Sequence, residues 1–209
     1  MKDLANSISV VQSLAPAVRT ADANGTGVDL QGFEGATVVV DSGAEGDTLS
    51  SLGIKFEIIE VPGHTLDHIA FYNEENNILF CGDTLFAGGC GRVFEGTFDQ
   101  MFESLNKLKQ LPDSTQIYCG HEYTKSNLLF SVEVEPKNND LIMRNTEIDN
   151  LLTEHGSSLP SSIGLEKKTN PFLRCDVLND NMHLIKKIGI DNPSEKEIFK
   201  YIREWKDSK

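Results

Sequence analysis

Residues 54–86 read IKFEIIEVPGHTLDHIAFYNEENNILFCGDTLF. Three apolar, β-branched runs in this stretch predict strands at 55–61, 69–72 and 78–81. A polar run at 73–77 predicts the hairpin turn between the last two strands. His64 follows the first strand and Asp83 follows the third. A turn at the end of a rigid sheet holds a metal ligand in a fixed direction, so the stretch predicts a sheet edge that carries such ligands.

A third polar turn lies further along the chain. Residues 116–119 predict another strand, and this strand ends at Gly120-His121. Helical spacing of apolar residues predicts helices at 97–111 and 124–134. Because each of these strands leads into its own polar turn, we expect His64, Asp83 and His121 at one end of one sheet.

The composition limits the classes of function. The chain has 209 residues, which is room for one large domain or two small ones. Its formal net charge of −13 argues against nucleic acid or an anionic membrane surface as a partner, because phosphates repel it. The apolar runs are shorter than a membrane span, and we find no signal-peptide pattern. The four cysteines show no CxxC spacing, so we interpret them as buried reduced thiols of a cytoplasmic protein.

Composition changes sharply near residue 52. Residues 1–52 hold no His or Cys, two basic residues, seven acidic residues and a single aromatic residue, Phe33. We expect a small β-rich segment here, with a helix at 4–18 and a strand at 36–41. The stretch GVDLQGFEGATVVVD (27–41), which precedes an acidic, glycine-containing loop, resembles small β-rich phage virion proteins.

Two further regions follow this segment. Residues 53–136 hold the strands and polar turns described above. Residues 137–209 predict a mainly helical region, with helices at 141–154 and 194–205. Ser194 is the expected N-cap of the last helix, and Glu197 occupies the capping-box position.

Five longer segments carry a family resemblance. They are VPGHTLDHI (61–69), FCGDTLF (80–86), GGCGRVFEG (88–96), YCGHEYT (118–124) and NPFLR (170–174). In these segments the chain resembles glyoxalase II, the hydroxyacylglutathione hydrolase of the metallo-β-lactamase superfamily. The resemblance extends from about residue 52 to residue 209. It implies an α/β fold: the second half of a metallo-β-lactamase αββα sandwich, followed by a helical C-terminal region that binds glutathione.

The resemblance also implies a metal centre. His64 matches a ligand of one metal, Asp83 matches the carboxylate that bridges two metals, and His121 matches a ligand of the second. Such ligands suit zinc, iron or manganese. In the implied chemistry, two metals roughly 3.5–4 Å apart share a hydroxide that attacks a glutathione thioester, such as S-D-lactoylglutathione. The alternative interpretation is structural: histidines held by the backbone, and an aspartate that caps a turn.

Five other residues match positions that hold the substrate. Arg92, Phe94 and Tyr123 match positions beside the glutathione part of the thioester. Arg203 and Lys206 match a basic pair that meets the glycine carboxylate of glutathione. Phe94 lacks the hydroxyl of the tyrosine found at its position in some relatives. Arg203 and Lys206 also fit a second interpretation, as the solvated face of an amphipathic helix.

One part of the family pattern is missing. The primary metal motif of the family, Thr-His-x-His-x-Asp-His, supplies most of the metal ligands and occurs nowhere in this sequence; the first histidine is His64. With His64, Asp83 and His121 alone, we expect at most one metal ion per chain, weakly held, and impaired hydrolysis.

Three functions are therefore compatible with the sequence. The first is an impaired hydroxyacylglutathione hydrolase. The second is a non-catalytic remnant that binds a metal or glutathione, and the third is a phage structural or accessory protein. Half of a sandwich also leaves an apolar sheet face uncovered. We expect residues 1–52, or a second copy of the chain in a homodimer, to cover that face.

Overall fold

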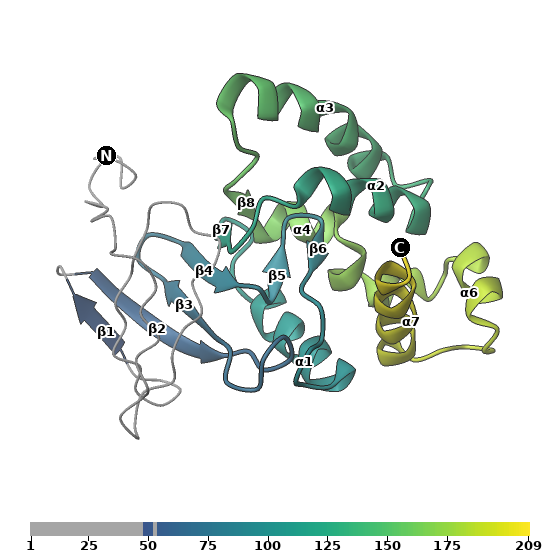
Figure 1. Ribbon diagram of the computed structural model, residues 1–209, viewed down its shortest axis with the longest axis horizontal. Helices are drawn as coiled ribbons and strands as arrows, with labels where there is room; N and C mark the ends of the chain where they lie inside the picture. Colours follow the sequence, from purple (N-terminus) through teal and green to yellow (C-terminus); the bar gives the residue numbers. More distant parts are fainter. Residues whose placement is uncertain (1–47, 52–53) are drawn as a thin grey trace.

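A mixed sheet organises the first half of the molecule. The computed structural model describes residues 48–51 and 54–209, so the helix and strand expected within residues 1–47 lie outside the described residues. The sheet has six strands in the order β1-β2-β3-β4-β7-β8 (Figure 1). Their bounds are β1 Thr48–Ser51, β2 Ile54–Glu60, β3 Ile69–Asn73, β4 Ile78–Gly82, β7 Gln116–Cys119 and β8 Ser161–Ser162. The four strands predicted from sequence are confirmed as β2, β3, β4 and β7.

Strand direction brings the polar turns to one edge. β2 pairs antiparallel with β3, and β3 pairs antiparallel with β4, whereas β4 and β7 run parallel. The C-terminal ends of β2, β4 and β7 therefore lie at the same edge. A small separate hairpin, β5 (Leu85–Phe86) with β6 (Gly89–Cys90), follows the turn after β4. Sequence periodicity does not predict this hairpin, because two residues per strand are too few to show alternation.

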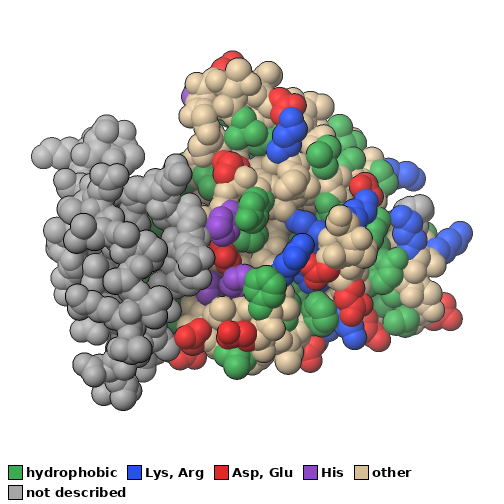
Figure 2. Space-filling view, viewed as in Figure 1, with side chains coloured by type: hydrophobic (Ala, Val, Ile, Leu, Met, Phe, Trp, Pro, Cys, Tyr) green, Lys and Arg blue, Asp and Glu red, His purple; other side chains and the backbone are tan. Residues whose placement is uncertain are grey.

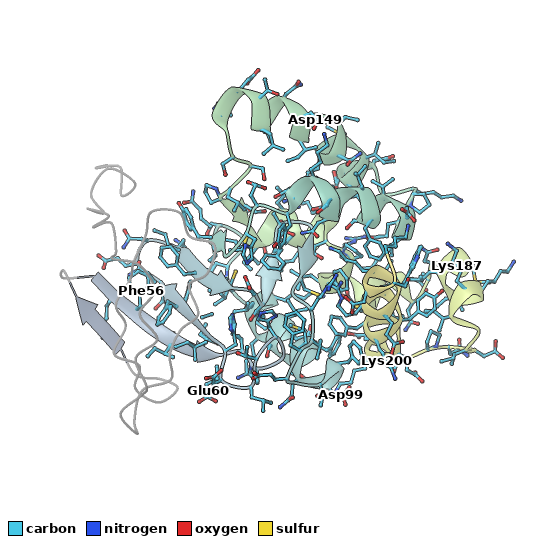
Figure 3. All side chains as sticks on the ribbon, viewed as in Figure 1. Phe56, Glu60, Asp99, Asp149, Lys187 and Lys200 are labelled. Atoms are coloured by element: carbon cyan, nitrogen blue, oxygen red, sulfur yellow. The ribbon has the colours of Figure 1, made fainter. Side chains whose placement is uncertain are left out.

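Two capped helices pack against each other beside the sheet (Figure 1). Helix α1 (Phe98–Lys109) begins with a capping box between Thr97 and Gln100, and α7 (Glu195–Asp207) begins with the predicted box between Ser194 and Glu197. The two helices pack together through Phe102 and Phe199, whose rings are 5.7 Å apart. Their apolar faces join β3, β4 and β7 in one core cluster. Figure 3 shows side chains filling the space between the sheet and these helices.

The remaining helices form the C-terminal region. Helices α2 (Thr124–Val134) and α3 (Asn139–His155) form the hairpin at the top of Figure 1. The shorter helices are α4 (Ile163–Thr169), α5 (Cys175–Leu178) and α6 (Met182–Ile188). The sequence predicts α2 and α3 but not these three, because seven residues or fewer show little helical periodicity. Among the described residues, no helix is long and apolar enough to span a membrane.

The opposite face of the sheet is also apolar. Phe80 contacts the rings of Phe56 and Tyr118, at centroid distances of 5.9 and 5.3 Å. Phe56 is labelled on β2 in Figure 3. In the strand register, Phe80 lies opposite Phe71, and Phe71 lies opposite Ile58. This is the face for which the sequence predicts a cover, and the homodimer stays a prediction.

The cysteines are as expected. All four are free and buried: Cys81, Cys90, Cys119 and Cys175. Burial raises the pKa of each thiol, that of Cys119 to about 11, so these thiols stay protonated near neutral pH.

Candidate metal centre

Three side chains from three turns converge on a single carboxylate oxygen. His64 follows β2, Asp83 follows β4 and His121 follows β7. The Nε2 atoms of both histidines lie 3.4 Å from Asp83 Oδ2. The three side chains are partly open to solvent, with exposed fractions of 17, 24 and 27% in chain order. The expectation that these groups meet at one sheet edge is therefore confirmed.

Glycines make this approach possible. A Cβ atom at Gly120 would overlap Asp83 Oδ1, so a side chain at this position would displace the carboxylate. At Gly82, φ is +49° and a Cβ atom would overlap the ring of His68. The turn after β4 therefore needs glycine as the last residue of the strand, and the turn after β7 needs glycine directly after it.

The backbone fixes the orientation of His64. Its Nδ1 lies 2.9 Å from the carbonyl oxygen of Arg92, and a carbonyl can only accept, so Nδ1 carries the ring proton. In the neutral ring, Nε2 then presents a lone pair toward the carboxylate of Asp83. Two acceptors 3.4 Å apart repel each other, and a proton or cation between them would relieve that repulsion.

His68 supports the turn from behind. Its Nε2 accepts a hydrogen bond from the backbone amide of Asp83 at 3.0 Å. Burial, with a smaller contribution from the neighbouring His64 ring, lowers the pKa of His68 and favours this neutral form. His68 therefore has a structural role behind the Asp83 turn.

Aromatic rings flank the two outer histidines. The ring of Phe94 lies 5.0 Å from His64, and Tyr123 stacks on His121 at 4.9 Å with an interplanar angle of 16°. Phe86, from the β5–β6 hairpin, contacts both His121 and Tyr123. Phe94 and Tyr123 are 67 and 48% exposed, so they form the solvent-facing rim of the centre next to His64 and His121. Figure 2 shows the histidines gathered around acidic atoms on this face, with Lys and Arg atoms further toward α7.

A cluster of basic groups lies next to this centre. Arg203 donates from Nη1 to the carbonyl of Cys90 at 2.9 Å and from Nη2 to Asp207 Oδ1 at 3.0 Å. The Nε of Arg92 lies 3.5 Å from the same Asp207 oxygen. The Arg92 side chain is 64% exposed, whereas that of Arg203 is only 3% exposed. The solvated-face interpretation is therefore wrong for Arg203, because this residue lies within the apolar stripe of α7.

Lys206 is held just beside that pair. Its Nζ donates to Asn127 Oδ1 and lies over the rings of Phe130 and Phe172, 5.6 and 5.9 Å from their centroids. Burial lowers the pKa of Lys206 to about 8. Sequence reasoning overlooked Asn127 and Asp207. The i, i+4 spacing of Arg203 and Asp207 was the available signal for the second of these.

The described residues do not complete a metal site. Each position beside Asp83 Oδ2 has two protein donors: that oxygen and one histidine nitrogen. Catalytic zinc sites use three protein ligands. Within residues 48–51 and 54–209, no group of three or more His, Cys, Asp and Glu side chains is arranged to hold a metal ion.

Comparison with known proteins finds relatives of most of the chain. Residues 122–209 match the family model "Hydroxyacylglutathione hydrolase C-terminus", and residues 39–121 match "Metallo-beta-lactamase superfamily". A hydroxyacylglutathione hydrolase of Pseudomonas savastanoi pv. phaseolicola is 50% identical over 163 residues, 77% of this chain and 63% of that protein. Residues 39–209 of this chain are therefore similar to the hydroxyacylglutathione hydrolases of the metallo-beta-lactamase superfamily. A second relative, from Psychromonas ingrahamii, is 46% identical over 166 residues, 78% of this chain and 64% of that protein.

Similarity to the metallo-beta-lactamase superfamily implies an α/β fold and a metal cofactor. The α/β fold that the sequence predicts is confirmed. The chain spans less than two thirds of the length of these relatives. A metallo-beta-lactamase of Staphylococcus aureus subsp. aureus COL is 24% identical, with a TM-score of 0.47, over 85% of this chain and 46% of that one. The assignment rests on the sequence matches. The phage-like resemblance of residues 1–52 finds no support, and the superfamily match begins within that segment.

Proposed function

We propose that this chain is a glyoxalase II-type thioester hydrolase by descent whose hydrolytic activity is impaired. The observation that carries the proposal is the convergence of His64 and His121 on Asp83, next to the basic cluster of Arg92, Arg203 and Lys206. The same geometry supports the impairment, because each position beside Asp83 Oδ2 has two protein donors. The substrate class follows from the relatives, which are named for hydroxyacylglutathione.

The described side chains divide into two groups under this proposal. His64, Asp83 and His121 are the remaining metal ligands, and they hold at most one zinc, iron or manganese ion per chain, weakly. The substrate-binding residues are Arg92, Phe94, Tyr123, Arg203 and Lys206. Arg92 and Lys206 supply positive charge for the carboxylates of glutathione, while Phe94 and Tyr123 flank the thioester. Arg203 acts from the interior, since its guanidinium is already bonded to Cys90 and Asp207.

Hydrolysis of S-D-lactoylglutathione tests the proposal. We expect the purified chain to hydrolyse it at close to the uncatalysed rate, with or without added zinc, iron or manganese. The variants Asp83→Ala and His121→Ala should change this rate little. A turnover of about 10 per second, typical of working enzymes, that His121→Ala abolishes would establish the hydrolase and contradict the impairment.

Metal content provides an independent test. Elemental analysis after dialysis should find less than one equivalent of divalent metal per chain, because two donors hold an ion poorly. Two tightly held equivalents would show that ligands outside the described residues complete the centre.

A second candidate function is a non-catalytic protein that binds glutathione. One observation favours it: Arg203 and Lys206 are held by Cys90, Asp207 and Asn127. Because these partners are not the candidate metal ligands, the basic cluster persists without a complete metal centre. Glutathione binding without turnover would distinguish this function from the first.

A further inference from the structure

We propose that Asp207 is a positioning residue, which acts on His64 from the C-terminal helix. Together with Arg203 it clamps the segment 90–92 to α7, and through the carbonyl of Arg92 the clamp sets the ring orientation and tautomer of His64. This inference rests on the proposed function only in taking His64 as part of the centre. Its test needs neither metal nor turnover.

The helix side of the clamp is Asp207 itself. This carboxylate is the last residue of α7, where the helix dipole disfavours negative charge. Its Oδ1 accepts from Arg203 Nη2 at 3.0 Å and lies 3.5 Å from Arg92 Nε. The two arginines thus compensate a charge that the helix end alone would not favour. The carboxylate of Asp207 also offsets the repulsion between Arg92 and Arg203. The positive charges of both arginines help to lower the pKa of the neighbouring Lys206.

The segment 90–92 is held at two points by these groups. Arg203 donates to the carbonyl of Cys90 at 2.9 Å, and the side chain of Arg92 reaches Asp207. Between them, the amide of Gly91 donates to the carbonyl of Thr84 at 3.2 Å. A Cβ atom at Gly91 would overlap the backbone carbonyl of Asp83, so the segment lies directly against the Asp83 turn.

The carbonyl of Arg92 connects the segment 90–92 to His64. It accepts from His64 Nδ1 at 2.9 Å, and the amides of Phe94 and Glu95 return two bonds to the carbonyl of His64, each at 3.3 Å. If Asp207 is removed, Arg92 loses the partner that draws it toward α7, and its exposed side chain moves into solvent. The Arg92 carbonyl then shifts relative to Nδ1, and the ring loses its preference for a proton on that nitrogen.

Long-range ¹H–¹⁵N NMR of the imidazole nitrogens tests this in chelator-treated protein. In spectra recorded at about pH 8, the separation of the two ¹⁵N resonances of the His64 ring reports which nitrogen carries the proton. A His64→Gln variant assigns the signals. We expect the native chain to show one protonated and one bare nitrogen, widely separated. The separation should shrink in Asp207→Ala, and also in Arg92→Ala, which removes the side chain but keeps the carbonyl.

The matched control is Glu204→Ala. Glu204 lies on the same helix, and its partner Lys200 is also exposed, at 3.9 Å. This variant should leave the His64 signals unchanged, because it removes an equal charge without touching the clamp. The double variant Arg92→Ala with Asp207→Ala should shift the signals no further than either single variant, because both act through one contact.

Two results would overturn the inference: unchanged His64 resonances in Asp207→Ala, or additive shifts in the double variant. Neither depends on substrate. If lactoylglutathione hydrolysis and glutathione binding both fail while the His64 signals respond as expected, the proposed function is wrong and the clamp stands.

Discussion

The ammonium group of Lys206 is largely buried. It lies over the rings of Phe130 and Phe172, and Asn127 is its hydrogen-bond acceptor. Burial lowers its pKa from an ordinary value of 10.5 to about 8. Below pH 8 the lysine is charged in both the folded and unfolded states, so burial of that charge costs stability. Between pH 8 and 10.5 the folded state is neutral and the unfolded state is charged, so stability from this group rises with pH.

This linkage predicts the behaviour of Lys206→Met. The free energy of unfolding of the native chain, minus that of the variant, should rise by about 2 kcal/mol between pH 8 and pH 10. Urea denaturation across this range measures the difference, and the titration of all other groups cancels. Lys200→Met, whose native side chain is 56% exposed, serves as the control and should give a flat difference. A flat difference for Lys206→Met would show that its ammonium is hydrated.

At the scale of elements, buried ion pairs connect the helices of the C-terminal region, and the carboxylate of one pair also bonds to the β5–β6 hairpin. Glu166 on α4 is fully buried and accepts from Arg144 on α3 at 2.7 Å and from Asn170 at 2.9 Å. It also accepts from the amide of Gly88, in the turn of the β5–β6 hairpin, at 2.7 Å. A second pair, Arg174 with Glu135, joins the NPFLR segment to the end of α2. The hydrogen bonds that Gly88 donates to Glu166 and that Asn170 donates to the carbonyls of Phe86 and Gly89 hold the hairpin beside the candidate centre.

Removing Glu166 should therefore be costly. Glu166→Ala should lower the free energy of unfolding by about 3–5 kcal/mol, because it leaves the buried guanidinium of Arg144 without its counter-charge. Glu103→Ala is the matched control, since its pair with Lys196 is largely exposed, and it should cost less than about 1 kcal/mol. Urea denaturation compares the two. Equal, small losses would mean that Arg144 finds another partner.

At the scale of the whole molecule, a basic cluster lies within a strongly acidic chain. The formal net charge is −13, yet Arg92, Arg203 and Lys206 lie near one another beside the candidate centre. Such a cluster attracts small carboxylates locally, although the chain as a whole repels anions. The apolar outer face of the sheet is the other feature at this scale, and the predicted homodimer concerns that face.

The cluster predicts weak glutathione binding. We expect a dissociation constant of about 1 mM, because few contacts offset the entropy lost on binding. Affinity should fall with added salt, and should fall again above pH 8 as Lys206 loses its proton. NMR titration measures both trends. Arg92→Ala should weaken binding, whereas Lys125→Ala, paired with Asp149 on the surface of α2 and α3, should not. Shifts confined to residues far from Arg92 and Tyr123 would contradict the prediction.

Local pattern determined much of the fold and of the candidate centre. The strands after residue 54, the capped helices α1 and α7, and the hairpin helices α2 and α3 all follow from alternation, helical spacing and caps, which depend on neighbours in sequence. His64, Asp83 and His121 could be placed at strand ends for the same reason. The short elements β5, β6, β8 and α4 to α6 could not be predicted, because long-range contacts stabilise them.

The sequence by itself thus determined the family segments, the order of the strands along the chain and the residues at their ends. Tertiary structure alone decided that His64 and His121 meet at one oxygen of Asp83, because that depends on which strands are neighbours. Tertiary structure also decided that the side chain of Arg203 is buried. A basic residue on an amphipathic helix can face water or the core, and here the carbonyl of Cys90 and the carboxylate of Asp207 provide partners for its guanidinium in the interior. The carbonyl of Cys90 is distant in sequence, so only the packed chain brings it to Arg203, whereas Asp207 lies one helical turn away and follows from the helix itself.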